Sequence, residues 1–193
     1  RDPLADGPLR GLSVLDVGCG GGLLAEPLAR LGARVVGIDA AEESLRIASL
    51  HARQSGLEID YRHASAESLA AAGESFDLVV NMEVVEHVAD LDAFLAACAA
   101  LVAPGGALVT ATLNRTPKAF LLAVVGAEYL LRWLPRGTHD WRRFVRPSEL
   151  AARLRPGGLS VVEVVGVTYN PIADTWRRSG DLGVNYMMFA VKD

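Results

Sequence analysis

Val14-Leu15-Asp16-Val17-Gly18-Cys19-Gly20-Gly21-Gly22 joins a short apolar run to a turn of closely spaced glycines. The apolar run predicts a buried strand, and a helical pattern follows the glycines. Glycine lets the backbone turn sharply and approach a ligand with no side chain in the way. In an open parallel sheet the ligand crevice lies beyond the carboxyl ends of the strands. The segment therefore predicts a cofactor-binding loop between a strand and a helix.

Two kinds of cofactor compete for a loop of this type. The dinucleotide fingerprint, Gly-x-Gly-x-x-Gly, places a pyrophosphate at the helix N-terminus. Here Leu23 stands where the third glycine belongs, and the charge of Asp16 disfavours a pyrophosphate. An acid at this place suits a cofactor with a cationic or amino group. Asp39, 17 residues after Gly22, can accept both hydroxyls of a ribose.

Outward from this loop, short apolar runs alternate with helical patterns. The expected strands are 13–17, 34–39, 58–63, 76–80 and 107–113, and the expected helices are 23–31, 42–54 and 92–102. Pro27 fits the first of these helices if it lies close to the first turn. The alternation predicts a doubly wound α/β fold with a parallel sheet covered on both faces.

The alternation stops after Asn114. The stretch 114–146 carries no strand pattern and contains an apolar helical segment, Ala119–Leu134, so we expect a helical insertion after the fifth strand. Two long apolar stretches, Leu159–Thr168 and Val184–Val191, then predict two strands that are joined by a loop and pair antiparallel.

We expect a single domain over residues 1–193. Its cofactor-binding half is predicted over 12–113, the insertion forms a lid or membrane-facing part, and 147–193 forms the substrate side. The composition agrees with a folded domain, because 51% of the residues are hydrophobic and 22% are charged. No apolar run is long enough to span a membrane. The two cysteines, in a glycine turn and an alanine-rich helix, indicate reduced thiols in a cytosolic protein.

The charge is unevenly distributed along a chain whose net charge is −4. Residues 115–155 hold nine basic and three acidic residues, whereas the rest of the chain is acidic. A basic segment on an acidic body favours an anionic partner such as a membrane surface. No nucleic-acid-binding motif accompanies the arginines, so no nucleic-acid partner is expected.

Four segments together resemble class I S-adenosylmethionine-dependent methyltransferases. They are the Asp16–Gly22 loop, Gly37-Ile38-Asp39, the strand Phe76–Val80 and the turn Leu101–Gly106. The resemblance implies a Rossmann-like, seven-stranded sheet with an antiparallel last strand. It also implies S-adenosylmethionine as cofactor. The residues implied to bind it are Asp16, Gly18, Gly20, Asp39 and Met82, with an adenine contact near Ser65-Ala66 or from Glu67.

Glu83, Glu86 and His87 follow the fourth expected strand at i, i+3 and i+4. On a helical turn these side chains would share one face, where two carboxylates and an imidazole could hold a divalent cation such as Mg²⁺. The alternative is a loop that orients the cofactor without a metal, and the spacing alone favours it.

The C-terminal third resembles the ubiquinone biosynthesis O-methyltransferase family. The segments that carry the likeness are 112–115 (Thr-Leu-Asn-Arg), 125–129 (Val-Gly-Ala-Glu-Tyr), 137–140 (Gly-Thr-His-Asp), 169–171 (Tyr-Asn-Pro) and 184–187 (Val-Asn-Tyr-Met). The resemblance implies methylation of a ring hydroxyl of polyprenylated catechol and demethylubiquinol. It also implies a divalent cation at Glu83, Glu86 and His87. It further implies a cofactor-binding arginine upstream of the first strand, which Arg1 and Arg10 do not match, in an N-terminal segment that this chain lacks.

His139 is a candidate general base, because the pKa of imidazole lies near ~6.5; a purely structural role that fastens the insertion is equally open. The apolar helix of the insertion is flanked by cations and could lie in a membrane interface. We therefore expect a bacterial cytoplasmic protein at the periphery of the inner membrane, with other ubiquinone-pathway proteins as partners.

Three alternative functions compete with this prediction. They are a methyltransferase for a soluble phenol, a non-catalytic cofactor-binding component of a biosynthetic complex, and a nicotinamide oxidoreductase, which Asp16 and Leu23 disfavour.

Overall fold

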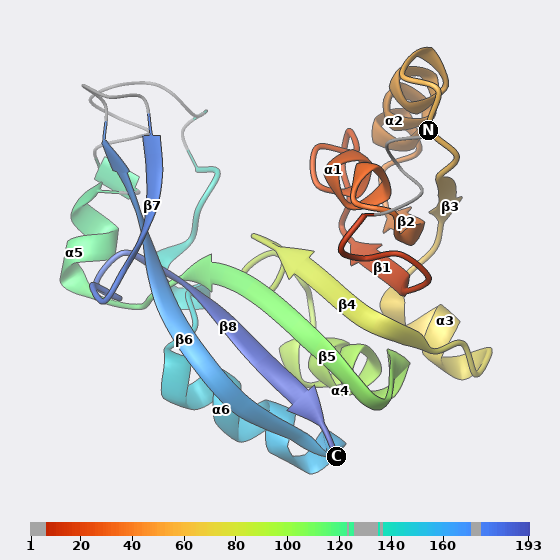
Figure 1. Cartoon of the computed structure of the whole chain (residues 1–193). Helices are drawn as coiled ribbons and strands as arrows, with labels where there is room; N and C mark the ends of the chain where they lie inside the picture. Colours follow the sequence, from red (N-terminus) through yellow and green to blue (C-terminus); the bar gives the residue numbers. More distant parts are fainter. Residues whose placement is uncertain (1–6, 123, 126–134, 136, 171–174) are drawn as a thin grey trace.

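The structure is a computed structural model, and it describes residues 7–122, 124–125, 135, 137–170 and 175–193. A twisted sheet runs through the molecule, with helices packed on it (Figure 1). The strands are β1 (Ser13–Val17), β2 (Arg34–Asp39), β3 (Asp60–His63), β4 (Phe76–Met82), β5 (Val102–Leu113), β6 (Leu159–Asn170), β7 (Thr175–Ser179) and β8 (Asn185–Lys192). The helices are α1 (Ala25–Arg30), α2 (Glu42–Gln54), α3 (Ala66–Ala71), α4 (Leu91–Leu101), α5 (Pro117–Ala119) and α6 (Pro147–Leu154), with 3₁₀ turns η2 (Trp141–Arg143) and η3 (Arg155–Gly157).

The strand order in the sheet is β3-β2-β1-β4-β5-β8-β6-β7. Strands β1 to β5 pair in parallel, while β8 runs antiparallel to both β5 and β6. Val17 at the end of β1 is in register with Ile38 of β2 and Asn81 of β4. This register brings the carboxyl ends of three strands to one edge, because parallel strands in register end together. The doubly wound α/β prediction is confirmed.

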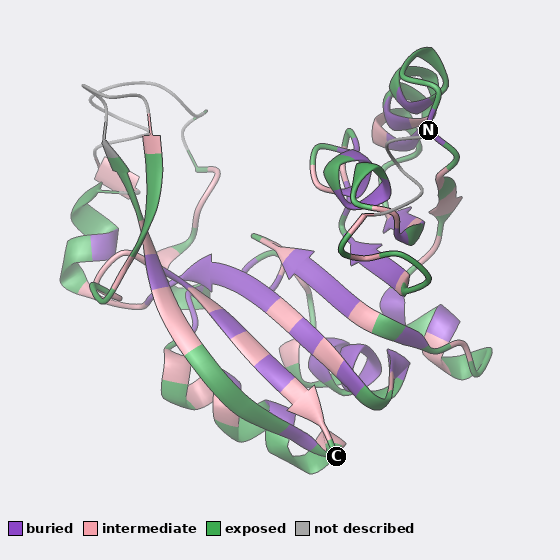
Figure 2. Ribbon diagram, in the orientation of Figure 1, coloured by how far each residue is buried: buried purple, intermediate pink, exposed green. Residues whose placement is uncertain are grey.

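Two apolar layers hold the helices on the sheet. Figure 2 shows much of β4 and β5 in purple, the colour of buried residues. Leu15 and Val79 belong to the layer that packs on α3, α4 and α6. Val14 and Val80 belong to the opposite layer, under α1 and α2. Alternate residues of one strand thus serve opposite faces, which explains the nearly continuous apolar runs in the sequence.

The structure adds one strand to the seven that were expected, because β7 pairs antiparallel with β6. This strand carries no apolar pattern along the chain, since Trp176, Arg177 and Arg178 are all exposed. The expectation that a loop alone joins the last two long strands is therefore wrong, because β7 lies between them. Their antiparallel pairing is confirmed.

The helical elements also differ in their bounds. The first helix begins at Ala25 rather than Leu23, so Pro27 falls in its first turn, where a missing N–H is tolerated. In the expected insertion, the described residues form α5, the helical residues that continue it to 122, and the turn η2. Most of the predicted Ala119–Leu134 helix, including Trp133, lies outside the described residues. No helix among those described is long and apolar enough to cross a bilayer.

Candidate active site

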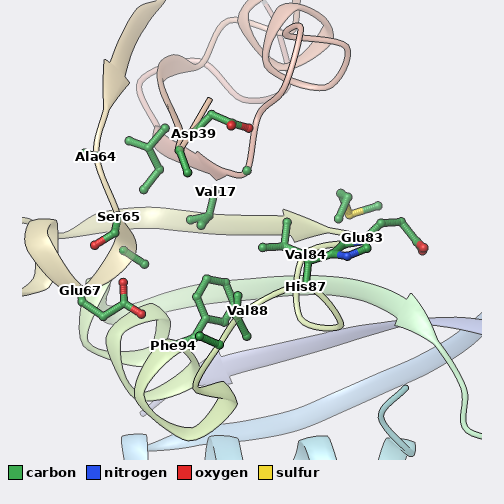
Figure 3. Close-up of a pocket in the computed structure, with 16 residues that line it drawn as sticks. Val17, Asp39, Ala64, Ser65, Glu67, Glu83, Val84, His87, Val88 and Phe94 are labelled. Carbon is green, nitrogen blue, oxygen red and sulfur yellow. The ribbon is translucent and has the colours of Figure 1, made fainter. Parts of the chain in front are cut away.

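A cavity of about 480 Å³ lies beyond the carboxyl ends of the parallel strands (Figure 3). Gly18, the residue after β1, lines it together with Asp39 of β2 and Met82 of β4. Figure 3 shows Glu67 and Phe94 entering from the α3 and α4 side. The cavity is therefore built where an open α/β sheet binds its ligand.

The glycine loop is fixed to the neighbouring strand by backbone hydrogen bonds. The N–H groups of Gly18 and Cys19 both donate to the carbonyl oxygen of Ile38, at 2.8 and 3.0 Å. Gly18 has a φ of +72°, and a Cβ there would lie 2.5 Å from Cγ2 of Val84. Both the backbone angle and the close approach of Val84 require glycine at this position.

Asp39 stands at the end of β2 and faces the cavity. Its Oδ2 accepts a hydrogen bond from the N–H of Gly20 at 2.9 Å, and its Oδ1 accepts one from the N–H of Ala41 at 2.8 Å. Each carboxylate oxygen has a second acceptor site. The side chain can therefore be held by the backbone and still accept two hydroxyl hydrogens from a ligand.

Asp16 and Gly20 are not among the residues that line the cavity. Asp16 is 2% exposed, and its Oδ2 has no hydrogen-bond partner among the described residues. Burial, opposed by a hydrogen bond from the Ala25 backbone and assisted by the charge of Asp39, raises the pKa of Asp16 to about 7. A cationic group near this carboxyl would favour its ionised form.

The chain leaves β4 through a turn with an unusual backbone. Glu83 has a φ of +56°. In the described part of the chain, no other residue except glycine has a positive φ. Its N–H donates to the carbonyl oxygen of Ala111 at 2.8 Å, so the β4–β5 pairing holds this strained residue in place. Positive φ values outside glycine gather at functional sites, which marks this turn as part of the site.

Glu83, Glu86 and His87 lie on this turn rather than on a helix, so the expected helical presentation is wrong. Glu83 and His87 line the cavity, whereas Glu86 is 3% exposed and points into the protein. There Oε2 of Glu86 accepts a 2.8 Å hydrogen bond from Thr112, and Oε1 has no partner within the described structure. In the described ranges, no three His, Cys, Asp or Glu side chains are grouped closely enough to hold a metal ion.

The carboxyl groups of Glu83 and Glu86 nevertheless interact. Desolvation of the carboxyl group and then the charge of Glu86 raise the pKa of Glu83 to about 8, although part of the Glu83 residue remains exposed. Two carboxylates side by side and one buried oxygen without a donor suit a cation. The imidazole of His87, the third expected ligand, is not grouped with these two carboxylates.

The structure brings His139 to His87. Their ring centroids are 6.2 Å apart, and the His139 ring also packs edge-on against Phe144 at 5.9 Å. The predicted base therefore lies beside a residue that lines the cavity. Ser65, Ala66 and Glu67, expected near an adenine, line the same cavity.

Two residues of the site escaped sequence reasoning. Phe94 of α4 forms part of the cavity wall, and Thr112 of β5 binds the buried Glu86. Phe94 follows the normal apolar spacing of a helix, so nothing in its pattern separates it from the core. Thr112 is 26 residues from its partner, and only strand pairing places them together.

A methyltransferase domain profile matches residues 15–110. The ubiquinone biosynthesis O-methyltransferase of Brucella anthropi is 60% identical over 190 residues, which cover 98% of this chain and 77% of that relative. The enzyme of the same name from Mesorhizobium japonicum is 57% identical over 192 residues, 100% of this chain and 77% of the relative. The chain belongs to the ubiquinone biosynthesis O-methyltransferase family. It is therefore a class I S-adenosylmethionine-dependent methyltransferase, with S-adenosylmethionine as cofactor.

Solved structures agree on the fold of this family member. Magnesium protoporphyrin IX methyltransferase from Synechocystis PCC 6803, with S-adenosylhomocysteine bound, has a TM-score of 0.73 at 23% identity, covering 98% of this chain and 78% of that one. A S-adenosylmethionine-dependent methyltransferase from Methanosarcina mazei has a TM-score of 0.71 at 20% identity, covering 94% and 92%. The class I methyltransferase sheet expected from the resemblance of the four segments is thus confirmed.

Proposed function

We propose that this chain transfers the methyl group of S-adenosylmethionine to a ring hydroxyl of polyprenylated catechol and demethylubiquinol intermediates of ubiquinone biosynthesis. The observation that carries the proposal is 60% identity, over 98% of the chain, to an enzyme named for this pathway. The cavity at the carboxyl ends of the strands supports it, because it joins Asp39 to the Glu83–His87 turn in one space.

Residues that line the cavity, together with Asp16 beneath the glycine loop, would hold the methyl donor. Gly18 lets the backbone pass close to the methionine part, and Asp39 accepts hydrogen bonds from the ribose hydroxyls. Asp16 lies beneath the loop, and its negative charge favours the cationic donor. Met82 packs against the donor. Methyl transfer requires the acceptor oxygen, the methyl carbon and the sulfur to be in line, so rigid positioning provides much of the acceleration.

The phenolic proton needs an acceptor, since a phenol with a pKa near ~10 is a weak nucleophile at neutral pH. We assign this role to His139, which lies beside His87 at the cavity wall. The phenolic oxygen forms a bond to the methyl carbon, the carbon–sulfur bond breaks with its electrons going to sulfur, and the imidazole takes the proton.

The acidic turn fits a divalent cation in part. Glu83 and Glu86 would hold Mg²⁺ through their carboxylates, with His87 of the same turn as the third ligand that the family resemblance implies. The free Oε1 of Glu86 supports this assignment, because a buried carboxylate oxygen with no donor invites a cation. When bound, such an ion lowers the pKa of a catechol hydroxyl and orients it.

The surface beside α5 supports a membrane-docking role for the insertion. Phe120, Leu121 and Leu122 are all exposed, and Leu121 is 58% exposed. Lys118 of α5 pairs with Asp181, which ties this helix to the turn after β7. On β7 itself, Trp176 is 66% exposed. Exposed apolar side chains beside α5 and on β7, with the exposed Arg177 next to Trp176 in the chain, suit the interface of an anionic membrane, such as the inner face of a bacterial inner membrane.

The first experiment measures methyl transfer from S-adenosylmethionine to a prenylated catechol and to catechol without the chain. Both are run with Mg²⁺ and with excess chelator. We expect turnover that prefers the prenylated acceptor and is lost on chelation. Equal rates on both acceptors would point to a soluble phenol instead. Failure to methylate either, in protein that binds S-adenosylmethionine, would contradict the proposal.

Two variants test whether the acidic turn binds a metal ion or only shapes the loop over the cofactor. Glu86→Gln should lower turnover with Mg²⁺ to the level seen with chelator, whereas Glu67→Gln, an acid on the opposite wall of the cavity, should keep the response to Mg²⁺. Turnover that survives chelation would return Glu83, Glu86 and His87 to the alternative role of shaping the loop over the cofactor.

Vesicle binding tests the docking surface. Leu121→Ser with Trp176→Ser should reduce sedimentation with phosphatidylglycerol vesicles several-fold. The control, Ile47→Ser with Leu50→Ser on the exposed face of α2, removes two exposed apolar side chains elsewhere. Equal loss in both variants would argue against this surface.

A further inference from the structure

A second pocket, of about 250 Å³, lies behind the wall of the cofactor cavity. Four arginines line it: Arg115, Arg142, Arg143 and Arg153. Its apolar part includes Phe144 and Val145, and Val88 and Ala89 line both this pocket and the cofactor cavity. One short segment thus separates an arginine-rich pocket from the candidate active site.

Carboxylates neutralise two of the four arginines. Arg115 pairs with Glu149, which also lines the pocket, and the guanidinium Nε of Arg153 lies 2.7 Å from Oδ1 of Asp92. Arg142 and Arg143 have no carboxylate partner for their side chains among the described residues. Two positive charges therefore remain uncompensated in one concave site.

The backbone holds these two arginines in place. They lie on the 3₁₀ turn η2, which Asp140 caps by accepting a hydrogen bond from the Arg142 N–H at 3.0 Å. The Arg143 guanidinium donates to the carbonyl oxygen of Val88, on the shared wall. Phe144, the next residue, is 1% exposed and anchors the turn in the protein.

We propose that this arginine pocket binds a phosphate group. The planar guanidinium matches the oxygens of a phosphate in geometry, and Arg side chains recognise phosphate through paired hydrogen bonds. The two uncompensated charges suit a phosphate group, whether a free phosphate, which carries about −1.5 to −2 at pH 7, or the singly charged phosphodiester of a lipid headgroup. The phosphate group belongs to a soluble anion or to a lipid headgroup. This inference stands apart from the proposed function, because it does not depend on the methyl acceptor.

The test measures binding of inorganic phosphate and inorganic pyrophosphate by calorimetry at fixed ionic strength. A parallel arm measures sedimentation with phosphatidylglycerol vesicles and with phosphatidylcholine vesicles. The variant is Arg142→Gln with Arg143→Gln. The control is Arg53→Gln with Arg155→Gln, which removes the same charge from exposed arginines outside the pocket. Arg142→Gln alone adds a variant that leaves the Arg143–Val88 bond intact.

We expect the pocket variant to weaken binding of the phosphate-bearing probe at least tenfold, with a smaller loss for Arg142→Gln and none for the control. Loss of free phosphate or pyrophosphate binding identifies a soluble anion. Loss confined to phosphatidylglycerol vesicles identifies a lipid headgroup. Equal binding by the wild type and the pocket variant, or an equal loss in the control, would overturn the proposal.

Discussion

The N–H of Gly20 donates a 2.9 Å hydrogen bond to Oδ2 of Asp39, so a side chain at the end of β2 holds the glycine loop in addition to the backbone bonds to Ile38. Together with the bond from Ala41 to Oδ1, it fixes the plane of the Asp39 carboxylate at the cavity. The residue proposed to bind ribose is therefore also the residue that shapes the loop.

Replacing this carboxylate tests both of its roles. In Asp39→Asn one oxygen becomes an NH₂ group, which cannot accept a hydrogen bond from a backbone N–H. We expect S-adenosylmethionine affinity to fall by about tenfold or more, since hydrogen bonds to charged groups contribute roughly 1.5–3 kcal/mol. Calorimetry gives the affinity, and Asp60→Asn on the exposed start of β3 is the control. Unchanged affinity in Asp39→Asn would remove Asp39 from the ribose contact.

Gly18 tolerates no side chain. Gly18→Ala would place a Cβ against Val84 and impose a positive φ on alanine, so the turn over the cavity must shift. We expect a loss of about 1–3 kcal/mol in the free energy of unfolding and weak cofactor binding. Gly21→Ala is the matched control, because no atom lies within 4 Å of a Cβ there. Urea unfolding and cofactor titration measure both effects; similar behaviour of the two variants would refute this reading of the loop.

Asp16 makes stability depend on pH. The folded protein keeps the Asp16 proton up to a pH of about 7, whereas an unfolded chain releases it near its ordinary pKa of 3.8. The protonated Asp16 carboxyl therefore makes its full contribution to the free energy of unfolding below pH 3.8. That contribution is lost as the pH rises from there through about 7. Asp16→Asn should be more stable than wild type by on the order of 2–4 kcal/mol at pH 8, and about equal to it at pH 3.5. Urea unfolding at both pH values gives the comparison.

Cofactor binding should show the opposite trend with pH. Ionised Asp16 attracts a cationic cofactor, so wild-type affinity for S-adenosylmethionine should rise between pH 6 and pH 8. Asp16→Asn should lose most of this rise. A parallel rise in both proteins would place the titrating group elsewhere.

Thr112 acts through Glu86. Thr112→Val removes the hydroxyl that donates to Oε2 of Glu86, and we expect kcat to fall while the KM for S-adenosylmethionine is unchanged. Thr112→Ser should restore kcat, because it keeps the hydroxyl. Thr110→Val is the control: Thr110 is equally buried on β5 but donates to Asn81. A merely structural role for Thr112 would lower stability in both valine variants by about 1 kcal/mol and leave kcat alone.

Local patterns were sufficient for the cofactor half of the fold. The apolar runs of β1, β2, β4 and β5 are buried on both faces, so each could be recognised from its own residues. The glycine loop was predictable for the same reason, because its backbone angles depend on the glycines themselves. The position of Asp39 beside the cavity could be predicted, because this residue ends a parallel strand.

Contacts between distant segments decided the rest. Strand β7 is exposed and takes its conformation from pairing with β6, as in the register of Tyr169 with Trp176. The bond between Glu86 and Thr112, and the approach of His139 to His87, depend on which strands and turns are neighbours in space.

The sequence by itself determined the strand–helix alternation and the glycine loop, because these follow from apolar patterning and backbone freedom along one stretch of chain. Tertiary structure alone decided that Glu86 points inward while Glu83 and His87 face the cavity. It also gathered Arg115, Arg142, Arg143 and Arg153 from three separate segments into one pocket. Side-chain direction and charge clustering of this kind depend on packing across the fold, which local periodicity does not encode.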